Sequence, residues 1–240
     1  MGVFTPLPRR SGTVSYRHSG TGEVWGVEDW LMTRGDDGLR VLSSHCEMGF
    51  ESESVVRDSL LSVDDSYHPH DCTVRIMNHG RVTGTGWFRF TDTLAECESW
   101  TEAEGRISQT MAISRPMRGF GIHALQGDGW LAATFPFDQG TGHVQHWEHS
   151  LLHSLHHFGA SGPWLHRSTS GLRYAGPETV TVPAGRFDCH RVQFVGMTYN
   201  HPPYDMWISR DGDFLYVKGA VQGYMDSHFE LVRLEGEPLA

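Results

Sequence analysis

The sequence lacks the short patterns that mark most cofactor and metal sites. No G-x-G-x-x-G or Walker A motif occurs, so dinucleotides and ATP are poor candidate ligands. No C-x-x-C pair occurs either, which argues against a zinc ribbon or a thioredoxin-like redox centre. We therefore expect no organic cofactor and four reduced cysteines packed as small hydrophobic side chains, namely Cys46, Cys72, Cys97 and Cys189.

Positive charge is also scarce. Lysine and arginine total 19 against 29 aspartate and glutamate, and Lys218 is the single lysine. An acidic surface repels phosphate groups, which argues against nucleic acid and anionic membrane surfaces as partners. The apolar runs are far shorter than the roughly 20 residues that a membrane span needs.

The N-terminal residues MGVFTPLPRRSG contain no apolar stretch long enough for a signal peptide. From this absence the sequence predicts a cytoplasmic protein.

What the sequence does contain is a series of short β-like runs separated by turn signals. At 240 residues, with 38% hydrophobic and 11% aromatic residues, the chain fits one large globular unit. We expect a single mostly β domain over residues 1–240, an antiparallel barrel or half-barrel of about ten strands. The pattern leaves open whether a second copy covers part of the sheet, as in a homo-oligomer.

Two hairpins are the clearest local predictions. Residues 179–182 and 187–194 flank Pro183-Ala184-Gly185, a typical tight turn. Residues 205–210 and 213–218 flank Asp211-Gly212, a pair that favours a two-residue type I′ turn. Pairing about Asp211-Gly212 would place Trp207 opposite Tyr216 and Ile208 opposite Leu215.

These two units resemble the strand–turn–strand patterns of antiparallel half-barrel proteins of the periplasmic lipoprotein-carrier type. The resemblance covers roughly residues 176–234 and rests on the turn pattern rather than on a catalytic motif. It implies a curved sheet around an internal cavity for an apolar molecule. Members of that group are usually exported.

One segment has a helical pattern. Between Gly142 and Gly159, at 100° per residue, an apolar stripe forms on one side and six histidines on the other. We predict a long helix here that covers or fills the concave face of the sheet. The histidines are His143, His146, His149, His153, His156 and His157.

Three interpretations of this histidine face stay open. The face can be a polar stripe in solvent, or it can point imidazoles into the cavity, where they would transfer protons. The pairs His146/His149 and His149/His153 also have the i, i+3 and i, i+4 spacing of zinc ligands. No H-E-x-x-H motif supports the zinc site.

Three other clusters could carry chemistry or could be ordinary loops and turns. His123 and Asp128 lie in one loop-rich stretch and could form a His–Asp pair. His201 and Tyr204 flank two prolines, and a tyrosine hydroxyl there is a credible acid or hydrogen-bond donor. Alternation along a final strand would place three further polar side chains on one face, namely Tyr224, Asp226 and His228.

The leading functional hypothesis is a cofactor-independent enzyme, a lyase, isomerase or dehydratase, acting on a hydrophobic and perhaps aromatic small molecule. Its expected acid–base and orienting residues are His149, His153, Tyr204 and Asp226. The expected substrate-binding residues are His146, His123, His201, Trp207, Tyr224 and His228. The alternatives are a non-catalytic carrier for a lipophilic ligand and a zinc-dependent hydrolase.

Overall fold

The computed structural model describes residues 6–50, 52–113, 117–197, 201–223 and 226–239, and of residues 50, 53, 148 and 149 only the backbone. Fifteen strands in these ranges form one sheet with the order β8-β7-β6-β5-β4-β3-β2-β1-β15-β14-β13-β12-β11-β10-β9. Every pairing is antiparallel except that of β9 with β10. The first and last strands of the chain are therefore neighbours, and the two ends of the sheet are β8 and β9.

The elements have the following bounds. The first half of the sheet contains β1 (Arg9–His18), β2 (Val24–Arg34), β3 (Arg40–Phe50), β4 (Glu53–Val63), β5 (Pro69–Asn78), β6 (Arg81–Phe90), β7 (Leu94–Thr101) and β8 (Gly105–Ala112). The connection to the second half holds β9 (Phe120–Gly121), α1 (Leu125–Ala133) and a 3-10 turn at Phe137–Gln139. The second half contains β10 (Val144–Leu152), β11 (His166–Val182), β12 (Gly185–Val195), β13 (Tyr204–Ser209), β14 (Tyr216–Val221) and β15 (Ser227–Glu235).

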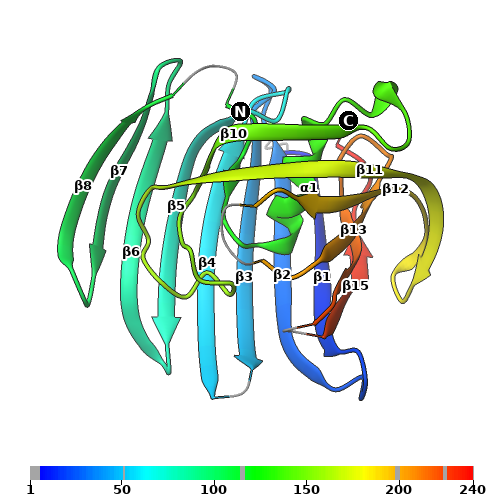
Figure 1. The fold of residues 1–240 in the computed structure, drawn as a ribbon, viewed down its shortest axis with the longest axis horizontal. Coiled ribbons are helices and arrows are strands. Elements are labelled where there is room, and N and C mark those ends of the chain that lie inside the picture. The colour runs from blue at the N-terminus through cyan, green and yellow to red at the C-terminus, as the bar shows by residue number, and fades with distance from the viewer. Residues whose placement is uncertain (1–5, 51, 114–116, 198–200, 224–225, 240) are drawn as a thin grey trace, which may run out of the picture.

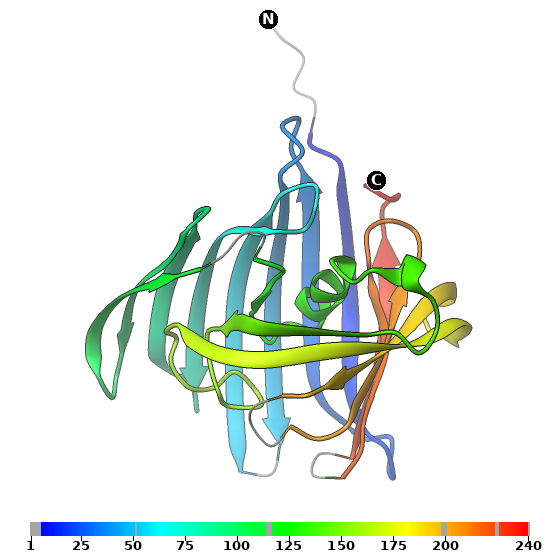
Figure 2. The ribbon, with the colours of Figure 1, turned by 45° about the horizontal axis from the view of Figure 1, so that its top comes forward.

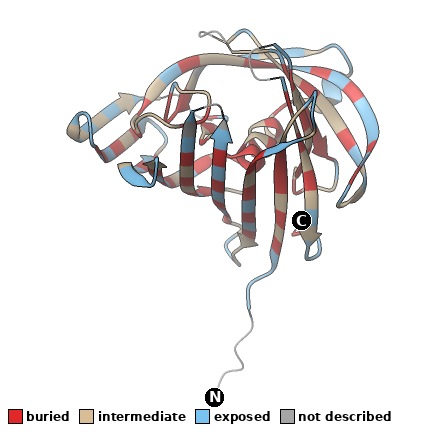
Figure 3. Ribbon diagram, turned by 90° about the horizontal axis from the view of Figure 1, so that it is seen from below, coloured by how far each residue is buried: buried red, intermediate tan, exposed pale blue. Residues whose placement is uncertain are grey.

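The sheet curls over itself without closing. Figure 1 shows β10 and β11 lying in front of the first-half strands and running across them, and Figure 2 shows the same overlap from a second angle. Buried and exposed residues alternate along the first-half strands, as expected for a sheet with one face covered (Figure 3). The predicted barrel-like β fold is thus confirmed in outline, with an open sheet that has fifteen strands in the described part of the chain rather than about ten.

The loop over residues 153–165 bridges the overlap. The side-chain amide of Asn78 on β5 donates a hydrogen bond to the carbonyl of Ala160 (3.0 Å). The side chain of Gln109 on β8 accepts from the backbone N–H of Leu165 (2.7 Å) and donates to its carbonyl (3.4 Å). Side-chain hydrogen bonds to this loop thus hold the two halves of the sheet against each other.

The prediction of a long helix over residues 143–158 is wrong. This segment forms strand β10, which pairs with β11 and β9, followed by the loop. Histidine and β-branched residues are weak helix formers, so pairing with two neighbouring strands outweighs the helical spacing of the apolar residues. Leu155, part of the expected apolar stripe, is 47% exposed in the loop.

The α-helix of the described residues is α1, in a segment that the sequence suggests to be loop. Its two glycines are poor helix formers, but both are needed for packing. A Cβ at Gly129 would lie 2.4 Å from the carbonyl oxygen of Phe214, and one at Gly127 would lie 2.7 Å from Ile122. The helix has nine residues, and it is not the long helix that the sequence predicts over residues 143–158.

Both predicted hairpins exist, but one has a different register. The first turns at the predicted place, but Val182 pairs with Gly185, so Gly185 belongs to β12 and the turn is the two residues Pro183-Ala184. In the second hairpin Trp207 pairs with Lys218 and Ile208 with Tyr216. The strands end at Ser209 and resume at Tyr216, because Asp211 accepts hydrogen bonds from the Ser209 hydroxyl and the Asp213 N–H and so stabilises a longer turn.

Candidate functional site

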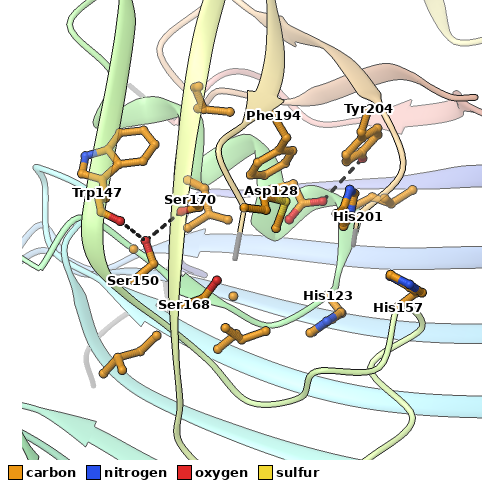
Figure 4. A pocket seen from close by; sticks show the side chains of 18 of the residues that line it. His123, Asp128, Trp147, Ser150, His157, Ser168, Ser170, Phe194, His201 and Tyr204 are labelled. Atoms are coloured by element: carbon orange, nitrogen blue, oxygen red, sulfur yellow. Dashed lines mark hydrogen bonds between the residues drawn. The ribbon is translucent and has the colours of Figure 1, made fainter. Parts of the chain in front are cut away.

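A cavity of about 410 Å³ lies inside the curled sheet. Residues from both halves of the sheet and from α1 line it, and part of the lining is drawn in Figure 4. Most of the lining is apolar, including Trp25, Met48, Leu125, Trp147, Phe194 and Phe229. The volume lies in the range of roughly 300–1,000 Å³ that is usual for small-molecule sites.

A buried acid fixes α1 beside this cavity. The carboxylate of Glu28 on β2 accepts hydrogen bonds from the backbone N–H groups of Leu125 (2.7 Å) and Gln126 (3.1 Å), at the start of the helix. It also accepts from the hydroxyl of Tyr16 (2.9 Å). A negative charge at a helix N-terminus is stabilised by unpaired N–H groups and by the helix dipole. Glu28, which is fully buried, therefore has a structural role.

Arg57 on β4 is the buried cation next to Glu28. Its guanidinium donates to the carbonyls of Phe158 and His123 (2.6 Å to the latter) and to the sulfur of Cys46 (3.3 Å). The Cys46 thiol in turn donates to Glu28 (3.3 Å). Arg57 thus connects β4 to the 153–165 loop and to the segment before α1. The side chain of Cys46 lies between Arg57 and Glu28 and contacts both. Burial raises the pKa of the Cys46 thiol to about 12, so this cysteine is not a nucleophile.

Asp128 of α1 presents a carboxyl group to the cavity. Its side chain has one hydrogen-bond partner in the described residues, the hydroxyl of Tyr204 on β13 (3.4 Å). Tyr204 is also hydrogen-bonded to the hydroxyl of Tyr216 on β14 (2.7 Å). Burial and, to a smaller extent, the nearby charge of Glu28 raise the pKa of Asp128 to about 8, although Arg57 and the hydrogen bond from Tyr204 oppose them. The carboxyl is therefore largely protonated at neutral pH.

Several imidazoles surround this carboxyl and remain neutral. Burial lowers the pKa of His123 well below its usual value, and the neighbouring His153 and Arg57 lower it further. Burial also lowers the pKa of His201 and of His157. Figure 4 shows His201 near Asp128 and Tyr204, with His123 and His157 on the same side of the cavity. Neutral imidazoles can each accept one hydrogen bond and donate another.

The opposite side of the cavity, on β10 and β11, has hydroxyl groups. Ser150 and Ser170 are hydrogen-bonded to each other (2.7 Å), and Ser168 lies nearby (Figure 4). The indole Nε1 of Trp147 is buried and has no hydrogen-bond partner among the described residues. The cavity thus has a carboxyl and imidazole side and a serine side, with apolar walls between them.

The structure places four of the ten predicted catalytic and substrate-binding residues in the lining of this cavity. His123, His146, His201 and Tyr204 all line the cavity. His123 and Asp128 both face it, but no hydrogen bond joins their side chains within the described residues.

Other predicted site residues lie elsewhere. His153 is fully buried, and its Nε2 donates to the carbonyl of Ile122 (3.2 Å) rather than lining the cavity. Trp207 packs against the charged groups of Arg191 and Lys218 (4.9 and 5.4 Å from its ring).

The predicted cluster near the last strand does not form. Asp226 is exposed and precedes β15, so it does not share a strand face with His228, which is half-buried outside the cavity lining. Tyr224 and the side chain of His149 lie outside the described residues.

Sequence reasoning missed Glu28 and Arg57. Each stands in an ordinary alternating strand, where a charged residue is expected to face solvent. The available signal was their phase, because both fall on the apolar side of the alternation, between Gly26 and Trp30 and between Val55 and Ser59. A charged residue in a buried phase indicates a paired or functional group.

No protein-family model and no curated protein matches this chain. Among solved structures, it is similar to a β-barrel-like protein of domain of unknown function DUF1849 from Brucella abortus, at 8% identity, over 97% of this chain and 98% of that one, with a TM-score of 0.59. A DUF1089 family protein from Pseudomonas aeruginosa matches at 9% identity, over 83% and 90%, with a TM-score of 0.47. A candidate exported protein with a YmcC-like fold from Bacteroides fragilis matches at 9% identity, over 96% of each chain, with a TM-score of 0.34.

These comparisons show a β-barrel-like fold and no activity. The prediction of a cytoplasmic location is withdrawn, because one of the similar structures is a candidate exported protein. No helix in the described residues is both long enough and apolar enough to cross a membrane. The resemblance to lipoprotein carriers is supported at the level of a barrel-like fold alone.

Proposed function

We propose that this chain binds a hydrophobic small molecule in the cavity inside its curled sheet. One observation carries the proposal: a cavity of about 410 Å³ with mostly apolar walls and a few converging polar groups. Sites of that size and composition commonly hold small apolar ligands, whose polar groups fix their orientation. This is the carrier role that the half-barrel resemblance implies, and it needs no cofactor.

Binding can be measured with diphenylhexatriene, a hydrocarbon that fluoresces in apolar surroundings. Ser170 lines the cavity, so Ser170→Trp is expected to fill part of it and to weaken probe binding by at least about 10-fold, equivalent to 1.4 kcal/mol. Thr110 is exposed on the edge strand β8, so Thr110→Trp is the matched control and is expected to bind as the wild type does. Equal binding by both variants and the wild type would contradict the proposal.

A second candidate is acid–base catalysis on such a molecule, as a lyase or isomerase. The observation in its favour is the carboxyl of Asp128, whose pKa burial raises to about 8, in contact with the Tyr204–Tyr216 hydroxyl pair. A carboxylic acid that ionises near neutral pH can give and take a proton, a contribution of roughly 10²–10⁴-fold to a rate. Asp128 and Tyr204 then take the roles that the sequence assigned to His149 and His153.

The two candidates differ in what happens to the bound molecule. Mass spectrometry of whatever co-purifies identifies a ligand, and its incubation with the protein shows whether it changes. Catalysis predicts a new product and a loss of about 100-fold or more in turnover for Asp128→Asn. A carrier predicts that the molecule is recovered unchanged. In the described residues no group of three histidine, cysteine or acidic side chains could hold a metal ion, so nothing specific favours a zinc hydrolase.

A further inference from the structure

The carboxyl of Asp128 lies among aromatic rings. Figure 4 shows it beside Phe194, His201 and Tyr204, all of which line the cavity. The rings of Phe194 and Tyr204 are stacked with centroids 5.6 Å apart, and His201 lies 6.1 and 6.0 Å from them. Phe229 packs edge-on against Tyr204 at 6.2 Å. The side of the cavity that holds the acid is therefore walled by π-systems.

Asp128 has no cationic partner among the described residues, since its single side-chain hydrogen bond comes from Tyr204. The other charges of the lining are engaged elsewhere. Arg118 is exposed and donates to the carbonyl of Thr134 (3.0 Å). Glu28 and Arg57 both contact the sulfur of Cys46, at 3.3 Å each, so their opposite charges lie close together. Three of the five guanidinium N–H groups of Arg57 donate to Phe158, His123 and Cys46. Asp128 is left as an acid that faces the cavity without a counter-ion.

We propose that the ligand of this cavity carries a basic nitrogen, held as an ammonium between the carboxylate of Asp128 and the rings of Phe194 and Tyr204. This inference rests on the proposed binding function and names its ligand class. An ammonium ion is attracted both to a carboxylate and to the faces of aromatic rings, and both attractions strengthen away from water. A hydrophobic body attached to the nitrogen would lie against Trp147 and Leu172.

Two other head groups fit these contacts less well. A carboxylate placed at the same position could accept a hydrogen bond from the protonated Asp128, but its negative charge would lie against the electron-rich faces of the aromatic rings with no cation in the described residues to pair with it. A neutral hydroxyl or carbonyl could take a hydrogen bond from Asp128 but would leave the aromatic faces without a cation. An amine uses both features at once.

Binding of an amine by Asp128 displaces the proton of its carboxyl group. In the empty cavity Asp128 is largely protonated at pH 7, because burial raises its pKa to about 8. An alkylamine enters as its ammonium form, since alkylamines resemble lysine, with a pKa near 10. Formation of the ion pair therefore releases the proton of Asp128 to solvent, close to one proton per ligand. The titratable and charged groups facing Asp128 are Glu28, Arg57, His201, Tyr204 and Tyr216.

Three probes with one chain length test this inference: octylamine, 1-octanol and octanoate, each measured by displacement of diphenylhexatriene at pH 7. We expect octylamine to bind at least about 10-fold more tightly than 1-octanol, and octanoate to bind most weakly. Asp128→Asn is expected to bring octylamine within about 3-fold of 1-octanol while the affinity for 1-octanol stays the same. Asp226→Asn, which removes an exposed acid outside the cavity, is the matched control and should retain the preference.

Calorimetry in buffers of different ionisation enthalpy gives the second readout. Octylamine binding should release close to one proton from the wild type at pH 7 and none from a folded Asp128→Asn variant. Failure of diphenylhexatriene and all three octyl compounds to bind would overturn the binding function itself. Probe binding with equal affinities for the octyl compounds, or with octanoate strongest, would overturn the amine inference alone.

Discussion

At the scale of single residues, Asp128 lowers the stability of the empty protein. Its pKa is about 8 in the folded chain and near 3.8 in the unfolded chain, so between these values only the unfolded carboxyl is ionised. Stability is therefore lost as the pH rises from about 4 to 8. We expect Asp128→Asn to raise the free energy of unfolding by about 2 kcal/mol at pH 8, less than the full linkage value because part of the carboxyl faces the cavity.

Urea denaturation at pH 4.5 and pH 8 measures this effect. The gain from Asp128→Asn should be large at pH 8 and close to zero at pH 4.5, where the carboxyl is protonated in both states. Asp226→Asn should change little at either pH, since Asp226 is exposed. A loss of stability for Asp128→Asn at pH 8 would mean that the folded chain stabilises the ionised carboxylate.

Buried and half-buried histidines produce the opposite pH dependence. Burial lowers the pKa of five histidines near the cavity and its loop, that of His153 to about 3, whereas unfolded histidine titrates near 6.5. Their effect on stability is absent above pH 6.5 and grows as the pH falls, by at most about 1.4 kcal/mol per pH unit for each group. The five are His123, His153, His157, His166 and His201.

The urea midpoint should therefore fall steadily from pH 7 to pH 5, because five groups outweigh the opposing effects of Asp128 and of His45, whose pKa is raised by hydrogen bonds to Asp58 and Glu47. His153→Gln keeps a donor for the Ile122 carbonyl but cannot be protonated, so it should flatten this slope. His79 is exposed in the turn between β5 and β6, outside the cavity lining, and His79→Asn should leave the slope unchanged. A midpoint independent of pH would show that the rings are not buried in neutral form.

The residues that sequence reasoning could find were those with distinctive chemistry in unusual positions. His123, His201 and Tyr204 stand out because they lie near glycine and proline turns, and all three line the cavity. Asp128 was recognised only as one member of a pair with His123. Its partner is Tyr204, 76 positions away, a separation that no local pattern reports.

At the scale of secondary-structure elements, long-range packing determines the structure of two segments whose local sequence patterns indicate something else. Residues 144–152 have helical spacing but form β10, because two strands supply hydrogen-bond partners. Residues 125–133 contain two glycines but form α1, because Glu28 accepts the first N–H groups of the helix and Phe214 leaves no room for a larger residue. The hairpin at Pro183-Ala184 could be predicted because its turn residues act locally.

The contact between β6 and the 153–165 loop gives a direct test of this packing. A Cβ at Gly84 would lie 2.1 Å from the carbonyl oxygen of Gly162 and 2.6 Å from Pro163. Gly84→Ala should therefore push the loop away and lower the free energy of unfolding by about 2 kcal/mol. Gly20 has nothing within 4 Å of such a Cβ, so Gly20→Ala is the control.

Thermal unfolding and diphenylhexatriene binding would be measured for both variants. Because the loop also contributes Phe158 to the cavity, Gly84→Ala should weaken probe binding as well as stability. Unchanged melting of Gly84→Ala would mean that the loop does not lie against β6.

At the scale of the whole molecule, the strand order is simple, but the curling of the sheet over itself is not visible in the sequence. Consecutive strands pair throughout β1–β8 and β10–β15, which the recurring turn signals suggest. The pairing of β1 with β15 joins the two halves, and it connects residues more than 200 positions apart. Curling of this sheet creates the cavity, so the predicted fold class was reachable while the shape of the site was not.

The β1–β15 junction can be tested by a disulfide. Thr13 and Arg233 are direct partners, and the guanidinium of Arg233 donates to the Thr13 hydroxyl (3.0 Å) across 220 positions. The four native cysteines are buried, so Thr13→Cys with Arg233→Cys should form the single new bridge on oxidation. Closing so long a loop restricts the unfolded chain, and we expect the free energy of unfolding to rise by about 3 kcal/mol, below the entropic limit because the Thr13–Arg233 contact is lost.

The control pair is Thr13→Cys with Glu235→Cys, which is two residues out of register. It should stay reduced, because a disulfide needs Cα atoms less than about 7 Å apart. Gel mobility and urea unfolding with and without reductant would report both results. A bridge in the second pair but not in the first would show a different register at the junction, and with it a different curl of the sheet around the cavity.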